Sequence, residues 1–290
     1  MNLTPAIIKE LREKSGAGMM DCKKALDESD GNVEKAIEWL RKKGINTAQK
    51  KSSRSASDGL ITVKIENNKG IIIEVNAETD FVARNENFQK FCDELAITGL
   101  KNETENVESL LNCKYLDSNL TVQENLTNLI SKLGENIVIR KLEYISENLG
   151  SLEKYLHNSI NQNSGKIGVL LCFKSNHENE KVNDFSKNIC MHIAATDPKS
   201  MNIESLDKKL VDKERSIYIE QLRSSNKPDE IIEKIVDGKI KKFYQEVCLL
   251  EQMFVMDNKM KINDCIAVFN KEHKENYEIK NFVIFKLGQE

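Results

Sequence analysis

Histidine and cysteine are the residue types of this chain that could carry metal or nucleophilic chemistry. The histidines lack the i,i+3 or i,i+4 spacing that places two imidazoles on one helix face, and none has a plausible ligand set: His157, His177, His192 and His273. The seven cysteines form no Cys-x-x-Cys pair and lie mostly among apolar neighbours, which is typical of reduced thiols in a core. We therefore expect no metal site and no cofactor, and interpret His192 as a structural helix histidine.

The sequence lacks the local motifs of nucleotide-binding loops and of activated nucleophiles. The segment Gly16-Ala17-Gly18 lacks both the preceding strand and the correctly spaced lysine of a phosphate-binding loop. No serine, cysteine or aspartate lies in a local signature that would orient a base beside it. The sequence thus predicts no direct nucleotide binding and gives an enzymatic function no positive support.

One polar segment, residues 76–85 (NAETDFVARN), is more informative, because it lies where a predicted strand leads into a helix. In one interpretation Thr79 or Asp80 caps the helix, and Phe81 begins its buried stripe. In the other, the polar residues at 84–85 interrupt that stripe, and Phe81 points outward as a binding anchor. The residues alone favour the buried interpretation, and they leave both open.

The elements before this segment form two groups. Three short helices are expected over residues 3–43, with Leu3, Ile7 and Leu11 on one face of the first and Gly44 ending the last. Residues 46–58 are poor in apolar side chains and are expected to be a linker. A strand pair then follows at 60–66 and 70–75, joined by a turn at Asn67-Asn68.

The elements after it repeat a coarse strand and helix pattern. Helices are predicted at 87–100, 122–133 and 182–195, and strands at 137–145, 151–159, 166–173 and 277–287. Two antiparallel helices, broken at Asn226-Lys227-Pro228, are expected to form an arm over about 205–248. The simplest organisation is α+β: a three-helix domain at 1–45, a linker at 46–58 and core subdomains at 59–148 and 149–290.

Composition limits the partners of the chain. The 43 lysines and arginines are balanced by 46 acidic residues, giving a net charge of −3. No overall positive field favours nucleic acid. No apolar run approaches the ~18 residues that a membrane span needs, and Met1 to Ile8 do not resemble an export signal. The sequence predicts a cytoplasmic protein with no membrane or nucleic-acid partner.

Four motifs resemble those of the elongation factor Ts family, and they occur in the family's order along nearly the whole chain. They are LREKSGAGMMDCKKAL at 11–26, Thr-Asp-Phe-Val at 79–82, Met-His-Ile-Ala-Ala at 191–195 and Phe-Val-Met at 254–256. The first two are highly specific. With this resemblance, the interpretation of Phe81 as an outward-pointing binding anchor is favoured over its interpretation as the start of a buried stripe.

The resemblance implies a ubiquitin-associated-like N-terminal domain, a two-part α+β core with antiparallel sheets and an antiparallel coiled-coil arm. It also implies a guanine-nucleotide exchange factor that binds elongation factor Tu, disturbs the Mg²⁺ and phosphate site of that GTPase and promotes GDP release. In the family the aspartate and phenylalanine of the second motif do this, which matches Asp80 and Phe81, flanked by Thr79 and Val82. Further matching contacts to the GTPase are Lys23, Leu133, His157, Val255 and Met256.

Other functions have weaker support. The lysine-rich stretch at 42–54, with Lys42, Lys43, Lys50, Lys51 and Arg54, could bind RNA, but aromatic residues are not interleaved with it. An enzyme could use Cys22 or Cys92, provided that the thiol had a low pKa. For the proposed contacts the simpler alternatives are a solvated helix lysine at Lys23 and strand core at Val255-Met256.

Overall fold

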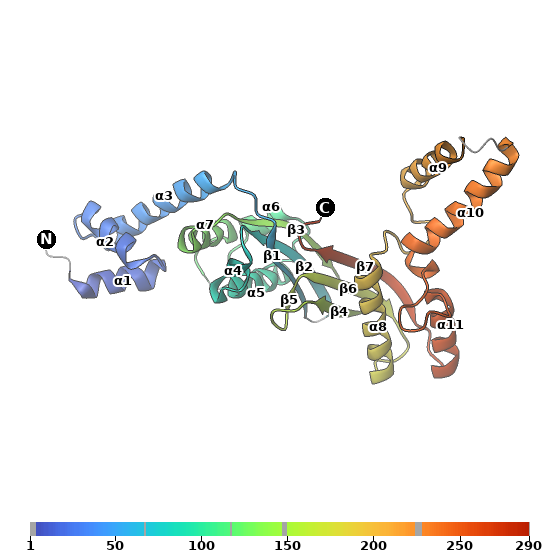
Figure 1. Ribbon diagram of the computed structural model, residues 1–290. Coiled ribbons are helices and arrows are strands. Elements are labelled where there is room, and N and C mark those ends of the chain that lie inside the picture. The colour runs from blue at the N-terminus through green and yellow to red at the C-terminus, as the bar shows by residue number, and fades with distance from the viewer. Residues whose placement is uncertain (1–3, 67, 117, 147–149, 224–227, 290) are drawn as a thin grey trace. The chain divides into compact units, whose positions relative to one another are not determined.

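The computed structural model describes residues 4–66, 68–116, 118–146, 150–223 and 228–289 of the 290-residue chain (Figure 1). The chain folds as two compact units: Met1–Ile145 with Leu156–Gly168 and Phe285–Glu290, and Ser146–Tyr155 with Val169–Ile284. Leu3 of the predicted first helix, Asn67 of the predicted turn and Asn226-Lys227 of the predicted break lie outside the described residues.

The first unit begins with three helices that share a small core. Gly16 ends the first helix in the left-handed conformation at φ 66°, which glycine adopts without steric cost. The side chain of Asn32 caps the third helix by accepting from the backbone N–H of Lys35. The helices are α1 (Pro5–Ser15), α2 (Met19–Glu28) and α3 (Val33–Lys51), and the buried core is Leu11, Cys22, Ala25, Leu26 and Ala36.

The predicted end of the third helix at Gly44 is wrong, because α3 continues to Lys51. Gly44 is buried where α3 meets α7 (Val122–Leu133): a Cβ at Gly44 would lie 3.6 Å from Thr127 Cγ2. Gly44 therefore lies at the contact with α7, where an added Cβ would make an ordinary van der Waals contact, and it does not end the helix. Farther along α3, Lys51 donates to the carbonyl of Gly134. Residues 46–51 of the stretch that suggested a linker belong to this docked helix, and residues 52–57 connect α3 to β1.

A four-stranded antiparallel sheet forms the centre of the first unit, in the order β3-β2-β1-β5. Its strands are β1 (Asp58–Glu66), β2 (Lys69–Ala77), β3 (Ile137–Ile145) and β5 (Ser164–Gly165). Alternate residues Leu60, Ile71 and Ile73 turn one face toward the helices, where they meet Phe88 and Leu95 in the largest buried cluster. The helices that build this layer are α4 (Asp80–Ala83), α5 (Glu86–Lys101), α6 (Val107–Asn112) and α7.

The second sheet has the order β4-β6-β7, made by β4 (Ser151–His157), β6 (Ile167–Lys174) and β7 (Glu278–Lys286). Two helices join it through aromatic rings: α8 (Glu180–Thr196) contributes Phe185 and α11 (Ile262–His273) contributes Phe269. The rings of Phe185 and Phe269 stack at 4.2 Å, and Tyr277 stacks on Phe173 of β6 at 5.1 Å. This cluster is the aromatic core of the second unit.

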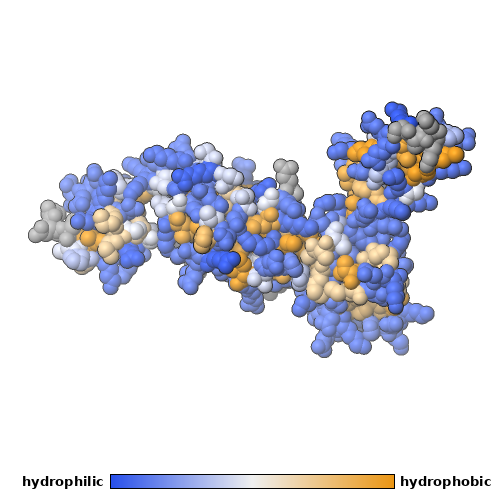
Figure 2. All heavy atoms as spheres, viewed as in Figure 1, coloured by the Kyte–Doolittle hydropathy of each residue, from blue (hydrophilic) through white to orange (hydrophobic). Residues whose placement is uncertain are grey.

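The helices α9 (Lys208–Arg223) and α10 (Asp229–Val247) run antiparallel. Early α9 packs against late α10 in a cluster around Phe243, whereas late α9 packs against early α10 around Ile232, Val236 and Ile240. Arg215 of α9 pairs with Glu233 and Asp237 of α10 on the outer face. Figure 2 shows orange, apolar residues between blue, polar ones on this helix pair.

The α+β class with N-terminal helices and two antiparallel sheets is confirmed. The elements α7 and β3 have the bounds that the sequence predicted, and the other predicted strands and the helices α5 and α8 differ by one or two residues at their ends. In the part of the chain that the structure describes, no helix combines the length and the apolar character needed to cross a bilayer.

Candidate functional site

The turn between β2 and α5 presents Phe81 to solvent. Phe81 is 80% exposed, whereas Val82 is 8% exposed and Ala83 is fully buried. The single helical turn α4 therefore places neighbouring side chains on opposite sides, with Val82 and Ala83 in the core and Phe81 outside. The interpretation of Phe81 as the start of a buried stripe is wrong, because that stripe begins at Phe88 on the next helix.

Asp80 stands beside Phe81 with a largely accessible carboxylate. Its side chain is 50% exposed, and its ion pair with Arg84 is long, at 3.6 Å, with Arg84 itself 71% exposed. An exposed pair of this kind is worth about 0–1 kcal/mol and is easily exchanged for another partner. Asp80 and Phe81 thus offer one negative charge and one aromatic ring at the same surface point.

Thr79 and Leu133 support this turn rather than extend from it. The hydroxyl of Thr79 donates to Glu135 Oε1 at 2.7 Å, so it faces the protein. Leu133, the last residue of α7, is partly buried against the main core cluster. Their chain positions bring both predicted site residues to the edge of the sheet from which Phe81 projects.

The N-terminal helices carry a separate exposed patch. Lys23 is exposed on α2, and the same helix exposes Met19 by 60% and Met20 by 76%. Two adjacent exposed methionines beside a lysine form a flexible apolar surface of the sort that binding interfaces use. Met19 and Met20 belong to the first motif but were not predicted as contacts; their position at the start of an amphipathic helix is the signal that indicates them.

His157 ends β4 and is exposed. Its carbonyl accepts from the backbone N–H of Lys166 at 3.1 Å, which fixes the backbone there. The nearby Gly165 is required for this approach, because a Cβ at that position would lie 2.8 Å from the His157 carbonyl oxygen. His157 is therefore presented by a rigid backbone.

Val255 and Met256 lie in a turn of the second unit, after the 3-10 helix η2 (Leu249–Glu251). Phe254 is buried, but Val255 is 38% exposed and Met256 is 49% exposed. The alternative interpretation of these two residues as strand core is wrong. Phe254 anchors the turn, and the two residues after it face solvent.

Two of the sequence motifs meet through His192, which is fully buried on α8. The backbone N–H of Val255 donates to His192 Nδ1 at 3.3 Å, and His192 Nε2 lies 2.9 Å from Gln252 Oε1. Since a backbone N–H can only donate, Nδ1 must be unprotonated, and the Nε2 proton is directed at Gln252. His192 is the structural histidine that the sequence predicted, and it also holds the turn that exposes Val255.

This arrangement predicts a loss of stability in mild acid. Burial lowers the pKa of His192 below its ordinary 6.5, so the folded state holds this proton less well than the unfolded state. The stabilisation is complete above pH 6.5 and is lost as the pH falls from there toward the folded pKa. Urea unfolding at pH 7.5 and 5.5 should show a smaller decrease for His192→Gln than for the wild type. His273→Gln is the control and should retain the wild-type decrease; equal decreases in all three proteins would contradict the prediction.

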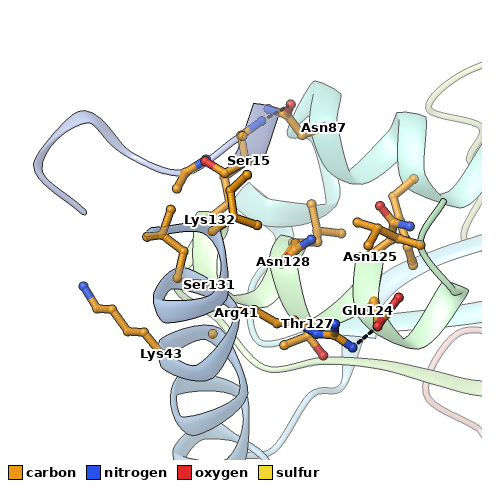
Figure 3. A pocket seen from close by; sticks show the side chains of 18 of the residues that line it. Ser15, Arg41, Lys43, Asn87, Glu124, Asn125, Thr127, Asn128, Ser131 and Lys132 are labelled. Carbon is orange, nitrogen blue, oxygen red and sulfur yellow. Dashed lines mark hydrogen bonds and ion pairs between the residues drawn. The ribbon is translucent and has the colours of Figure 1, made fainter. Parts of the chain in front are cut away.

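A cavity of about 710 Å³ lies between α3 and the helices α5 and α7 (Figure 3). Its accessible lining is more apolar than polar, and its cations already have partners: Arg41 pairs with Glu124, and Lys132 donates to Asn87 Oδ1 at 2.7 Å. It therefore lacks the converging uncompensated charges of an anion site.

The described side chains that could support catalysis do not form an active site. Six of the seven cysteines are buried, among them Cys22 and Cys92, and burial strongly raises the pKa of Cys92. A buried thiol with a raised pKa is a poor nucleophile. Across the described ranges, no group of three His, Cys, Asp or Glu side chains is placed to hold a metal ion. The exposed features of the chain are instead suited to binding a protein surface.

Comparison with known proteins gives a consistent result. The family model described as Elongation factor TS matches residues 78–289. Elongation factor Ts of Rhodospirillum centenum is 44% identical over 290 residues, covering 99% of this chain and 93% of the relative. The Ehrlichia canis protein is 42% identical over 289 residues, covering 100% of both chains. The Rickettsia felis protein is 41% identical over 290 residues, covering 100% of this chain and 93% of the relative.

Proposed function

The chain belongs to the elongation factor Ts family, and from this membership we infer that it is a guanine-nucleotide exchange factor for elongation factor Tu in translation elongation. The observation that best supports a specific mechanism is the exposure of Phe81 beside the accessible Asp80 on a turn anchored by buried neighbours. Exposed aromatic anchors on rigid supports are typical centres of binding energy. We therefore propose Thr79–Val82 as the segment that acts on the nucleotide site of the GTPase.

The proposed mechanism uses binding energy and no covalent step. Mg²⁺ requires a near-octahedral oxygen shell and links the nucleotide phosphates to the GTPase, so a small displacement of its protein ligands weakens nucleotide binding. Phe81 supplies the apolar contact that displaces the GTPase segment, and Asp80 supplies a competing negative charge. A factor that binds the nucleotide-free state more tightly must lower the affinity for GDP by the same factor.

Further contacts with the GTPase are proposed from other parts of the chain. We propose that Lys23, beside the exposed Met19 and Met20, contacts the GTPase from the N-terminal helices. Val255 and Met256 would contribute an apolar contact from the second unit. Leu133 and His157 are proposed as further contacts, supported by their places at the end of α7 and the end of β4.

The family also suggests names for the parts of the chain. We propose that residues 1–45 are a ubiquitin-associated-like domain, supported by its three helices around one small core. The divisions at 46–58, 59–148 and 149–290 are likewise proposals. The antiparallel pair α9 and α10 is proposed as the coiled-coil arm, supported by its two successive apolar clusters and the Arg215 ion pairs.

The function is tested by measuring release of a fluorescent GDP analogue from elongation factor Tu after mixing with excess unlabelled GDP. The wild-type chain is expected to increase the release rate in proportion to its concentration until the complex saturates. Added EDTA should reduce the advantage given by the factor, because it removes the Mg²⁺ that the factor otherwise displaces. Release that is independent of the factor would overturn the proposed function.

A further inference from the structure

We propose that Glu135, assisted by Glu78, is a positioning residue for nucleotide exchange. The two carboxylates link two chain junctions by reciprocal hydrogen bonds, here called the clamp, and the clamp sets the direction of Phe81. The inference rests on the proposed function of Phe81. One junction leads from β2 into α4, and the other leads from α7 into β3. Each junction supplies a carboxylate to the backbone of the other.

The first half of the clamp holds the residue before the exposed pair. Glu135 Oε1 accepts from the hydroxyl of Thr79 at 2.7 Å, and Glu135 Oε2 accepts from the backbone N–H of Thr79 at 3.1 Å. Thr79 is the N-cap of α4, yet its side chain makes no capping bond within α4. Its hydroxyl is committed to Glu135, so the turn is oriented by the distant junction.

The second half runs in the opposite direction. Glu78 Oε1 accepts from the backbone N–H of Asn136 at 2.6 Å and lies 3.6 Å from Arg54 Nη1. Asn136 is buried, and its side chain donates to the carbonyl of Arg54 at 2.8 Å. Carboxylates that accept from backbone N–H groups form charge-assisted hydrogen bonds, which are stronger and shorter than neutral ones. Glu78 and Glu135 thus fix both junctions at once.

The clamp begins where the sheet ends. Ala77 pairs with Ile137 as the last pair of the β2–β3 ladder, and the clamp joins the residues immediately beyond it. Gly134 permits this geometry, because its left-handed conformation at φ 76° turns the chain from α7 toward Glu135. The hydrogen bonds of Glu78 and Glu135 therefore link the two chains just beyond the last pair of the β2–β3 ladder.

This position explains why the clamp matters for Phe81. Phe81 is 80% exposed, so core packing alone does not fix its direction, and only its neighbours Val82 and Ala83 enter the core. Glu135 also follows Leu133 by two residues along the chain. One carboxylate therefore sets the spacing between two proposed contacts with the GTPase, and a binding element misplaced by about 1 Å loses much of its effect.

The test measures GDP release from elongation factor Tu with Glu135→Ala, Thr79→Val and Thr79→Ser. Glu135→Ala is expected to lower the second-order rate constant about tenfold, the size of one charge-assisted hydrogen bond. Thr79→Val loses the hydroxyl and should be slower than the wild type, whereas Thr79→Ser keeps the donor and should recover most of the rate. The control is Glu143→Ala, which removes an exposed carboxylate on β3 and should behave as the wild type.

A double-mutant cycle separates positioning from general stability. If Glu135 acts through Phe81, Glu135→Ala should cost little further activity in a Phe81→Ala background. An equal cost in both backgrounds, or a wild-type rate for Glu135→Ala alone, would overturn the inference. Amide hydrogen exchange at Thr79 gives a second measurement that does not depend on elongation factor Tu. Unchanged protection of that amide in Glu135→Ala overturns the clamp, whereas a wild-type chain that fails to release GDP overturns the proposed function.

Discussion

Replacing Phe81 with alanine is expected to lower the rate constant for factor-dependent GDP release by about 30-fold or more, the loss of roughly 2 kcal/mol typical of a central aromatic contact. The effect should arise in the complex, because an 80% exposed ring contributes little to the folded chain alone. The thermal midpoint of Phe81→Ala should therefore stay near that of the wild type. Stopped-flow release of fluorescent GDP over a range of factor concentrations provides the rate constant.

The double variant Asp80→Ala/Phe81→Ala should lose more activity than Phe81→Ala, because the negative charge beside the ring is removed as well. Val268→Ala is a suitable control, since Val268 is also an exposed apolar residue, 39% exposed on α11, and it lies outside the proposed contacts. Rapid GDP release by the double variant would assign the mechanism to other contacts. A comparable defect in Val268→Ala would show that loss of exposed apolar area is sufficient by itself.

A large effect on stability is expected at Gly59. Gly59→Ala should lower the free energy of unfolding by about 3 kcal/mol, which combines backbone strain with overpacking. Gly59 has φ 133°, a conformation that L side chains rarely adopt, and an added Cβ would lie 2.1 Å from the Val75 carbonyl oxygen. The strained φ and the clash with the Val75 carbonyl oxygen both involve the backbone, so no side-chain rotation can relieve them. The expected decrease in Tm is about 6–12 °C.

Gly238→Ala is the matched control for this substitution. Gly238 is exposed within α10, and nothing lies within 4 Å of an added Cβ. Alanine there should raise stability by about 0.5–1 kcal/mol, because it reduces the freedom of the unfolded chain and favours the helix. Calorimetry of both variants compares the same chemical change at a crowded and at an open site. A Gly59→Ala protein that melts with the wild type would contradict the strain argument.

Gly59 also connects stability to function. It pairs with Asn76 in the β1–β2 register, close to the chain end from which Thr79 and Phe81 follow. A shift of β1 that accommodates alanine would move this end of β2. Reduced GDP release is therefore expected in Gly59→Ala even at temperatures where the protein remains folded.

Local patterns were sufficient to predict much of the fold. The helix α7 and the strand β3 have clear periodicity and clear end signals, with Thr121 as a capping residue and Gly134 as a stop, and their predicted bounds were correct. The helix α11 was not predicted, although Ile262, Cys265 and Phe269 have helical spacing. The helical spacing of these three residues is the local signal that indicates this helix.

Long-range contacts account for what could not be predicted. The helix α3 passes through Gly44 because α7 lies against it, and nothing in the local sequence specifies that neighbour. At the site, periodicity left the direction of Phe81 open, and only the family motif favoured exposure. Glu78 and Glu135 were not predicted as site residues, because their partners come from the opposite junction. Hydrogen bonds between segments more than fifty residues apart leave no periodic signal.

The helices α9 and α10 differ in how many of their side chains are buried. The described residues of α9 include none that is fully enclosed, whereas α10 encloses Ile232, Val236, Ile240 and Phe243. The buried side chains of α10 depend on the partly buried apolar residues of α9 that pack against them, so separating the two helices would return Ile232, Val236 and Ile240 to water. We expect the two helices to move as one unit when the chain meets a partner surface.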